Sequence, residues 1–140
     1  MRTYLPRLAL ATAAAMAFAG ATAGAASAPV VKTARNAKLH HTVLVNRAGH
    51  TLYALSAERN GRFVCTDREC LGFWTPLTVR RGSHPRGTVG SLATIRRPDG
   101  KTQVTYRGRP LYSFYADGRG DANGEGFKDV GTWHAVVPSH

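Results

Sequence analysis

The stretch PLYSFYAD (Pro110–Asp117) resembles an earlier stretch of the same chain, TLYALSAE (Thr51–Glu58). Each stretch carries a Leu-Tyr pair and ends on an acidic residue. The chain has two tryptophans, and each lies 21 residues beyond the tyrosine of its own stretch. The residues related by this single shift of 59 are Tyr53 and Tyr112, Leu55 and Phe114, Glu58 and Asp117, and Trp74 and Trp133. Two copies are too few for a stacked solenoid, so the pattern predicts a duplicated half-domain that closes on itself.

Each copy also reads as a β-hairpin followed by a tryptophan-containing strand. In the first copy VLVN (43–46) and TLYAL (51–55) flank a turn with Gly49, and in the second TQVTY (102–106) and RPLYSFY (109–115) flank Gly108. No run of helical periodicity follows Thr42. We therefore predict an all-β, small single domain of about seven or eight short strands, built from two repeated halves. Copy one should span about 43–79 and copy two about 92–138.

The N-terminus has the features of a secretory signal peptide. Two arginines precede an apolar run over residues 8–20, and small residues in an A-x-A pattern follow. We expect a signal peptide over 1–25, with cleavage after Ala28 as the alternative, then a flexible basic lead-in over 26–41 and the folded domain over 42–140. The expected mature chain is secreted or otherwise extracytoplasmic, and soluble, with no membrane span.

The chain is strongly basic. Its formal net charge is +11, and removal of Arg2 and Arg7 with the signal peptide leaves +9. The loop VRRGSHPRG (79–87) gathers three arginines, Arg80, Arg81 and Arg86. Guanidinium groups match phosphate and carboxylate geometry, so this cluster suggests an anionic envelope polymer as a partner. The competing interpretation is that arginine keeps a small secreted domain in solution. There is no strong nucleic-acid signal, and the oligomeric state is not indicated.

Cys65 and Cys70 are the only cysteines. An even pair this close in an oxidising compartment predicts a disulfide. An extended segment would hold the two Cα atoms about 16 Å apart, so the segment between them must turn. A zinc site would need two further ligands at suitable spacing, and none is evident.

The segment DANGEGFKD (121–129) is the one candidate metal loop. It spaces oxygen-bearing side chains as a calcium loop does, but Thr132 stands where a bidentate glutamate is needed and no helices are expected beside it. We therefore expect a glycine-rich solvated loop and no metal. A metal-handling accessory protein, using this loop or the six histidines, stays open as an alternative function. The weak candidate ligands are Asp121, Asn123, Glu125 and Asp129.

The spacing Tyr112-x-Phe114-x-x-Asp117 resembles the Y-x-[FWY]-x-x-D motif of the secreted-repeat family, whose members are also described as predicted lipoproteins. The likeness extends over roughly Val43 to Pro138. Leu55 and Glu58 depart from the motif in copy one, and no lipid-attachment cysteine is present. The resemblance implies an extracytoplasmic β module and carries no established activity.

Two interpretations of the repeated aromatic residues stay open. Alternating rings supply large apolar area to a core, and an acid at the strand end accepts bonds from loop N–H groups. Alternatively Tyr53, Trp74, Tyr112 and Trp133 line an exposed binding groove. No nucleophile, metalloprotease or phosphate-loop motif appears, so we expect a non-catalytic module without a cofactor. A small hydrolase with paired carboxylates is the lesser alternative.

Overall fold

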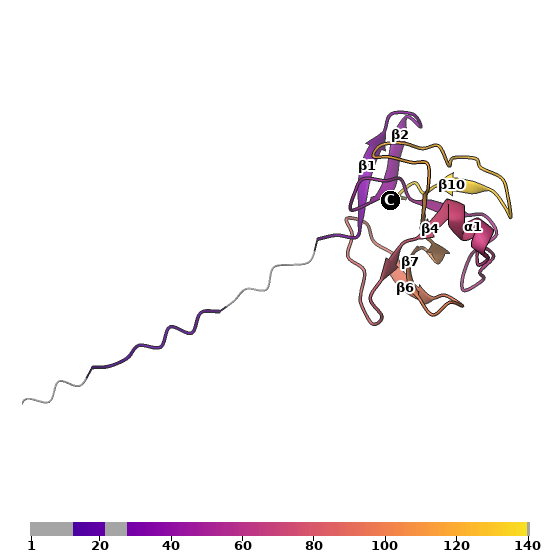
Figure 1. The fold of residues 1–140 in the computed structure, drawn as a ribbon. Helices are drawn as coiled ribbons and strands as arrows, with labels where there is room; N and C mark the ends of the chain where they lie inside the picture. Colours follow the sequence, from indigo (N-terminus) through magenta and orange to yellow (C-terminus); the bar gives the residue numbers. More distant parts are fainter. Residues whose placement is uncertain (1–12, 22–27, 140) are drawn as a thin grey trace, which may run out of the picture.

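The computed structural model describes residues 13–21 and 28–139 (Figure 1). Residues 13–21 are exposed and contain neither helix nor strand. Most of the expected signal peptide lies outside the described residues, as do Ala25 and the residues just before the alternative cleavage point at Ala28. Among the residues described, none of the helices has the length and apolar character needed to cross a membrane.

The folded part of the chain consists of short antiparallel strands and one short helix, arranged in three sheets. The elements are β1 (Val31–Asn36), β2 (His41–Asn46), β3 (Tyr53–Leu55), α1 (Arg68–Phe73), β4 (Trp74–Pro76), β5 (Thr78–Val79), β6 (Leu92–Arg96), β7 (Thr102–Tyr106), β8 (Arg109–Pro110), β9 (Tyr112–Phe114) and β10 (Trp133–Ala135). The sheet orders are β1-β2, β10-β3-β9-β4, and β5-β7-β6 with β8 beside β7. The all-β prediction is confirmed, with ten strands in the described residues instead of about seven or eight.

The central four-stranded sheet displays the duplication directly. Strands β3 and β9 meet at Tyr53 opposite Tyr112, the two copies of one repeat position. On the outer sides Trp133 pairs with Leu55 and Trp74 pairs with Phe114. Each outer pairing becomes the other under the 59-residue shift. The sheet therefore has an approximate two-fold relation that exchanges the two halves of the chain.

A hairpin precedes the central strands in each half: β1-β2 in the first and β6-β7 in the second. The expected flexible lead-in over 26–41 is therefore wrong where β1 forms, and copy one begins near Val31 instead of 43. The side chain of Val31 is fully buried and Asn36 is 2% exposed, while the residues between them are mostly exposed. Because β1 has few apolar residues, it shows almost no strand-like alternation of apolar and polar positions. Its buried residues are covered because the strand pairs with β2.

Apolar side chains gather in two core clusters that use alternating residues of the central strands. Tyr53 and Leu55 belong to an aromatic cluster, whereas Leu52 and Ala54 belong to a largely aliphatic one. The segment after each tryptophan strand crosses to the other half, since the Leu77 N–H donates to a carbonyl of copy two and the Val136 N–H to one of copy one. The halves are thus interlocked and share one interior.

Candidate functional site

The repeated tyrosines and acids bond across the two copies. The Tyr53 hydroxyl donates to Asp117 Oδ2 at 2.5 Å, and the Tyr112 hydroxyl donates to Glu58 Oε2 at 2.7 Å. Burial, followed by the bond to Asp117, raises the pKa of Tyr53 well above its ordinary value. Burial and the nearby charge of Glu58 do the same for the pKa of Tyr112. Both phenols are therefore neutral donors, and each carboxylate links its own loop to the opposite half.

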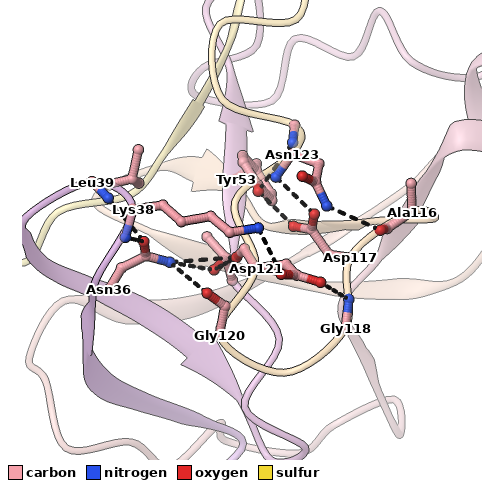
Figure 2. A network of polar contacts seen from close by, with 12 residues as sticks. Asn36, Lys38, Leu39, Tyr53, Ala116, Asp117, Gly118, Gly120, Asp121 and Asn123 are labelled. Atoms are coloured by element: carbon pink, nitrogen blue, oxygen red, sulfur yellow. Dashed lines mark hydrogen bonds and ion pairs between the residues drawn. The ribbon is translucent and has the colours of Figure 1, made fainter.

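The second oxygen of each carboxylate holds the loop that follows it. Glu58 Oε1 accepts the backbone N–H groups of Val64 and Cys65 at 2.8 and 2.7 Å. Asp117 Oδ1 accepts the N–H of Asn123 at 2.8 Å (Figure 2). Val64 and Asn123 are equivalent under the 59-residue shift. Despite its longer side chain, Glu58 therefore makes the same kinds of hydrogen bond as the motif aspartate: one from a tyrosine hydroxyl and others from backbone N–H groups of the following loop.

Arg97 is a buried member of this network that sequence reasoning missed. Its side chain is 1% exposed, and its Nη1 donates to the Tyr112 hydroxyl at 2.9 Å and to Gln103 Oε1 at 2.7 Å. Its Nη2 donates to the carbonyl oxygen of Cys65 at 2.8 Å. A buried charge is tolerated only when it is paired and hydrogen-bonded. Arg97 meets both needs, since its Nε also pairs with Asp99 Oδ2 at 3.4 Å. In the sequence it is one arginine among many.

The four repeated rings belong to the interior. Tyr53, Trp74, Tyr112 and Trp133 are each 0% exposed, and the two indoles stack with centroids 3.8 Å apart and planes at 11°. The alternative of an exposed aromatic groove is therefore wrong. These rings, with Glu58 and Asp117, hold the two halves together and are not accessible to a ligand.

The predicted disulfide is present between Cys65 and Cys70, with Cα atoms 5.5 Å apart. The required turn is helix α1, which the sequence did not predict. Asp67 caps this helix by accepting the Cys70 N–H at 2.9 Å. Both cysteines belong to the aromatic core cluster, so the disulfide attaches the start of α1 to the loop before it inside the core.

The two tryptophans differ in one polar contact. Trp133 Nε1 donates to Asp129 Oδ1 at 2.8 Å. Cys70 occupies the position in copy one that Asp129 occupies in copy two, and its sulfur is in the disulfide. Trp74 Nε1 is buried and is the one buried side-chain nitrogen or oxygen without a hydrogen bond in the described part of the chain. Copy one therefore has a disulfide cysteine at the position where copy two has the hydrogen-bond acceptor of its tryptophan.

The acidic glycine-rich loop is occupied by contacts within the protein. Asp121 pairs with Lys38 at 2.8 Å (Figure 2), and Glu125 contacts His134 Nδ1 at 2.8 Å. Asp129 accepts from Trp133, and the backbone of Asn123 donates to Asp117. Within residues 13–21 and 28–139, no three His, Cys, Asp or Glu side chains form a group able to hold a metal ion.

The predicted arginine cluster lies in the long loop between β5 and β6. Arg80 and Arg86 line a depression of about 460 Å³ together with His84 and Arg47, and Arg81 is not part of the lining. Arg47 comes from the turn after β2 and donates to the carbonyl oxygen of Ala28 at 2.8 Å. We call this surface the loop depression. Sequence reasoning missed Arg47 because it lies far from the loop along the chain.

One segment of the chain is similar to a known family. A family model described as a secreted repeat of unknown function matches residues 93–137, which run from β6 to just beyond β10. Searches of curated proteins and of solved structures each gave no match. The match covers most of copy two, and the pairings of the central sheet relate copy one to it. The family resemblance inferred from the sequence is confirmed to this extent: residues 93–137 match the family described as a secreted repeat of unknown function.

Proposed function

We propose that the chain is a secreted, non-catalytic module that binds an anionic polymer of the cell envelope at the loop depression. The observation that carries the proposal is the lining of this surface. Arg47, Arg80, His84 and Arg86 surround it, and none of the described residues that line it is acidic. A cluster of one sign in a concave surface raises the local concentration of counter-ions, including charged polymer segments.

The chemistry of the lining favours oxyanions. A guanidinium group donates two parallel N–H bonds to a phosphate or carboxylate, which a scattered lysine surface does not do. Arg47 is already held by the carbonyl oxygens of Ala28 and Pro29, so less side-chain entropy is lost when a ligand binds there. The loop itself is closed by a turn in which the Ser83 N–H donates to the carbonyl of Arg80 at 3.0 Å.

The non-catalytic part of the proposal rests on the carboxylates. Glu58 and Asp117 are buried and bonded to tyrosine hydroxyls, and Asp121 is paired with Lys38. A glycoside hydrolase needs two carboxyl groups facing a substrate cleft. Another depression is lined by Asp67, Glu69 and Asp129, but Asp67 caps α1 and Asp129 accepts from Trp133 Nε1. The loop depression itself is lined by arginines and a histidine and, among the described residues, by no carboxylate.

The test compares two double variants with the same loss of charge. Arg80→Ser with Arg86→Ser should weaken binding to poly(glycerol phosphate) by at least about tenfold. It should also reduce the slope of log K against log salt by about 1.4 to 1.8, since two phosphate contacts are lost. The control, Arg35→Ser with Arg62→Ser, removes two exposed charges that lie outside the depression. Equal losses in the two variants would show diffuse attraction and overturn the site.

The metal-handling alternative is tested in parallel. The melting temperature of the wild-type protein is measured with and without calcium, copper or zinc. A concentration-dependent rise would indicate selective binding to the folded state and favour that alternative.

A further inference from the structure

A second basic pocket lies between the two halves. It has a volume of about 470 Å³. Arg59 comes from copy one, while in copy two Arg107 comes from the turn between β7 and β8 and Arg109 is the first residue of β8. The remaining lining residues are Tyr106, His134, Ala135, Val136, Val137 and Ser139. We call it the inter-repeat pocket. None of the described residues that line it is acidic.

We propose that the inter-repeat pocket binds a phosphate monoester, using Arg59, Arg107 and Arg109 as its anion-binding side chains. The proposal is independent of the loop depression, since the two surfaces share no lining residue. Three guanidinium groups around one concavity match the several acceptor oxygens of a phosphate group.

The backbone of the turn that carries Arg107 is anchored to neighbouring loops at a conformational cost. Arg107 has φ of 51°, a left-handed conformation that is unfavourable for a residue with a side chain. Its N–H donates to the carbonyl of Ser91, and the Asn60 N–H donates to the carbonyl of Gly108, both at 3.0 Å. Gly108 has φ of 75°, and a Cβ there would lie 2.3 Å from Asn60 Oδ1, so any other residue would strain the backbone and displace the Asn60 side chain. The backbone of the next residue, Arg109, pairs with Tyr106 of β7.

The duplication provides an internal comparison. Under the 59-residue shift, Ala48 stands where copy two has Arg107, and His50 stands where it has Arg109. Gly118 occupies the position that corresponds to Arg59. Copy one closes the corresponding hairpin with a turn of different geometry, in which Gly49 has positive φ and Ala48 does not. The three arginines of the inter-repeat pocket therefore have no counterpart in the other copy.

The pocket wall also favours negative charge. The Tyr106 hydroxyl accepts the Ser139 N–H at 3.1 Å and lies 3.4 Å from Ser139 Oγ. The guanidinium carbon of Arg107 lies 5.8 Å from the centre of the Tyr106 ring. Hydrogen bonds from Ser139, together with the charge of Arg107, lower the pKa of Tyr106. Surroundings that favour a phenolate also favour the oxygens of a bound phosphate.

The key variant is Arg107→Gly. Glycine adopts positive φ without strain, so this change removes the guanidinium and should leave the domain folded, with a free energy of unfolding equal to or above that of the wild type. Arg109→Ser is the second variant, and Arg62→Ser is the single-charge control outside the pocket. Binding of glycerol 3-phosphate is followed by calorimetry and by the NMR signal of ¹³C-labelled Tyr106.

We expect the wild type to bind and the Tyr106 signal to shift. Arg107→Gly and Arg109→Ser should each weaken binding by about tenfold or more, whereas Arg62→Ser and the Arg80→Ser, Arg86→Ser double variant should not. Vesicles containing phosphatidic acid distinguish a lipid phosphate from a soluble ester by co-sedimentation. A wild-type protein with no Tyr106 shift at about 10 mM glycerol 3-phosphate and no sedimentation with the vesicles would overturn the proposal. Unchanged binding by folded Arg107→Gly would overturn it as well.

Discussion

Replacing Tyr112 by phenylalanine isolates the hydrogen bonds that join the two halves. The ring stays in the core, and only the hydroxyl is lost. That hydroxyl donates to Glu58 and accepts from Arg97, at 2.7 and 2.9 Å, in a buried site. Hydrogen bonds to charged groups contribute about 1.5–3 kcal/mol each. We therefore expect Tyr112→Phe to lower the free energy of unfolding by about 3–6 kcal/mol, a large part of the 5–15 kcal/mol of a typical domain.

The same substitution at two other tyrosines gives reference values for the loss of stability. Tyr53 has one bond to a carboxylate and a longer one, at 3.3 Å, from the N–H of Gly124. Tyr53→Phe should therefore cost about 1.5–3 kcal/mol, less than Tyr112→Phe. The side chain of Tyr115 is largely exposed, so Tyr115→Phe should change stability by less than about 0.5 kcal/mol.

The assay is urea unfolding of the oxidised protein, followed by tryptophan fluorescence, with the m-value compared among variants. A double-mutant cycle with Glu58→Gln then measures the coupling to the carboxylate. The reasoning is refuted if Tyr112→Phe costs no more than Tyr115→Phe at an unchanged m-value. Equal costs at positions 53 and 112 would refute the added role of Arg97.

Three further predictions follow from buried or paired groups. Mass spectrometry of the unreduced secreted protein should show the Cys65–Cys70 link with no free thiol, and reduction should lower stability by about 2 kcal/mol without unfolding the domain. Trp133→Ala should cost about 3–5 kcal/mol in denaturant melts, because the ring is fully buried, and a loss below about 1 kcal/mol would contradict this placement. The bond from Lys38 lowers the pKa of Asp121, so this contribution to stability is present above about pH 4 and is lost as the pH falls through the lowered pKa. NMR titration of the Asp121 carboxyl should show its pKa rise in Lys38→Met, and an unchanged pKa would contradict the pairing.

The duplication and the all-β class could both be predicted from local spacing along the chain. Tyr53 and Tyr112 lie at the same distance before their tryptophans, and alternation of apolar residues around them marks short strands. The disulfide could also be predicted, because two nearby cysteines in an oxidising compartment usually form one. These features are local, so they can be recognised from the spacing of residues along the chain.

Tertiary structure alone decided which groups meet. Tyr53 bonds to an acid 64 residues away, and Arg97 reaches the Cys65 carbonyl across 32 residues. Strand β1 has too few apolar residues to be recognised without β2, and Arg47 joins the loop depression from another turn. No local pattern encodes these contacts, since pairing, burial and charge neutralisation depend on groups that approach only when the two halves close on each other.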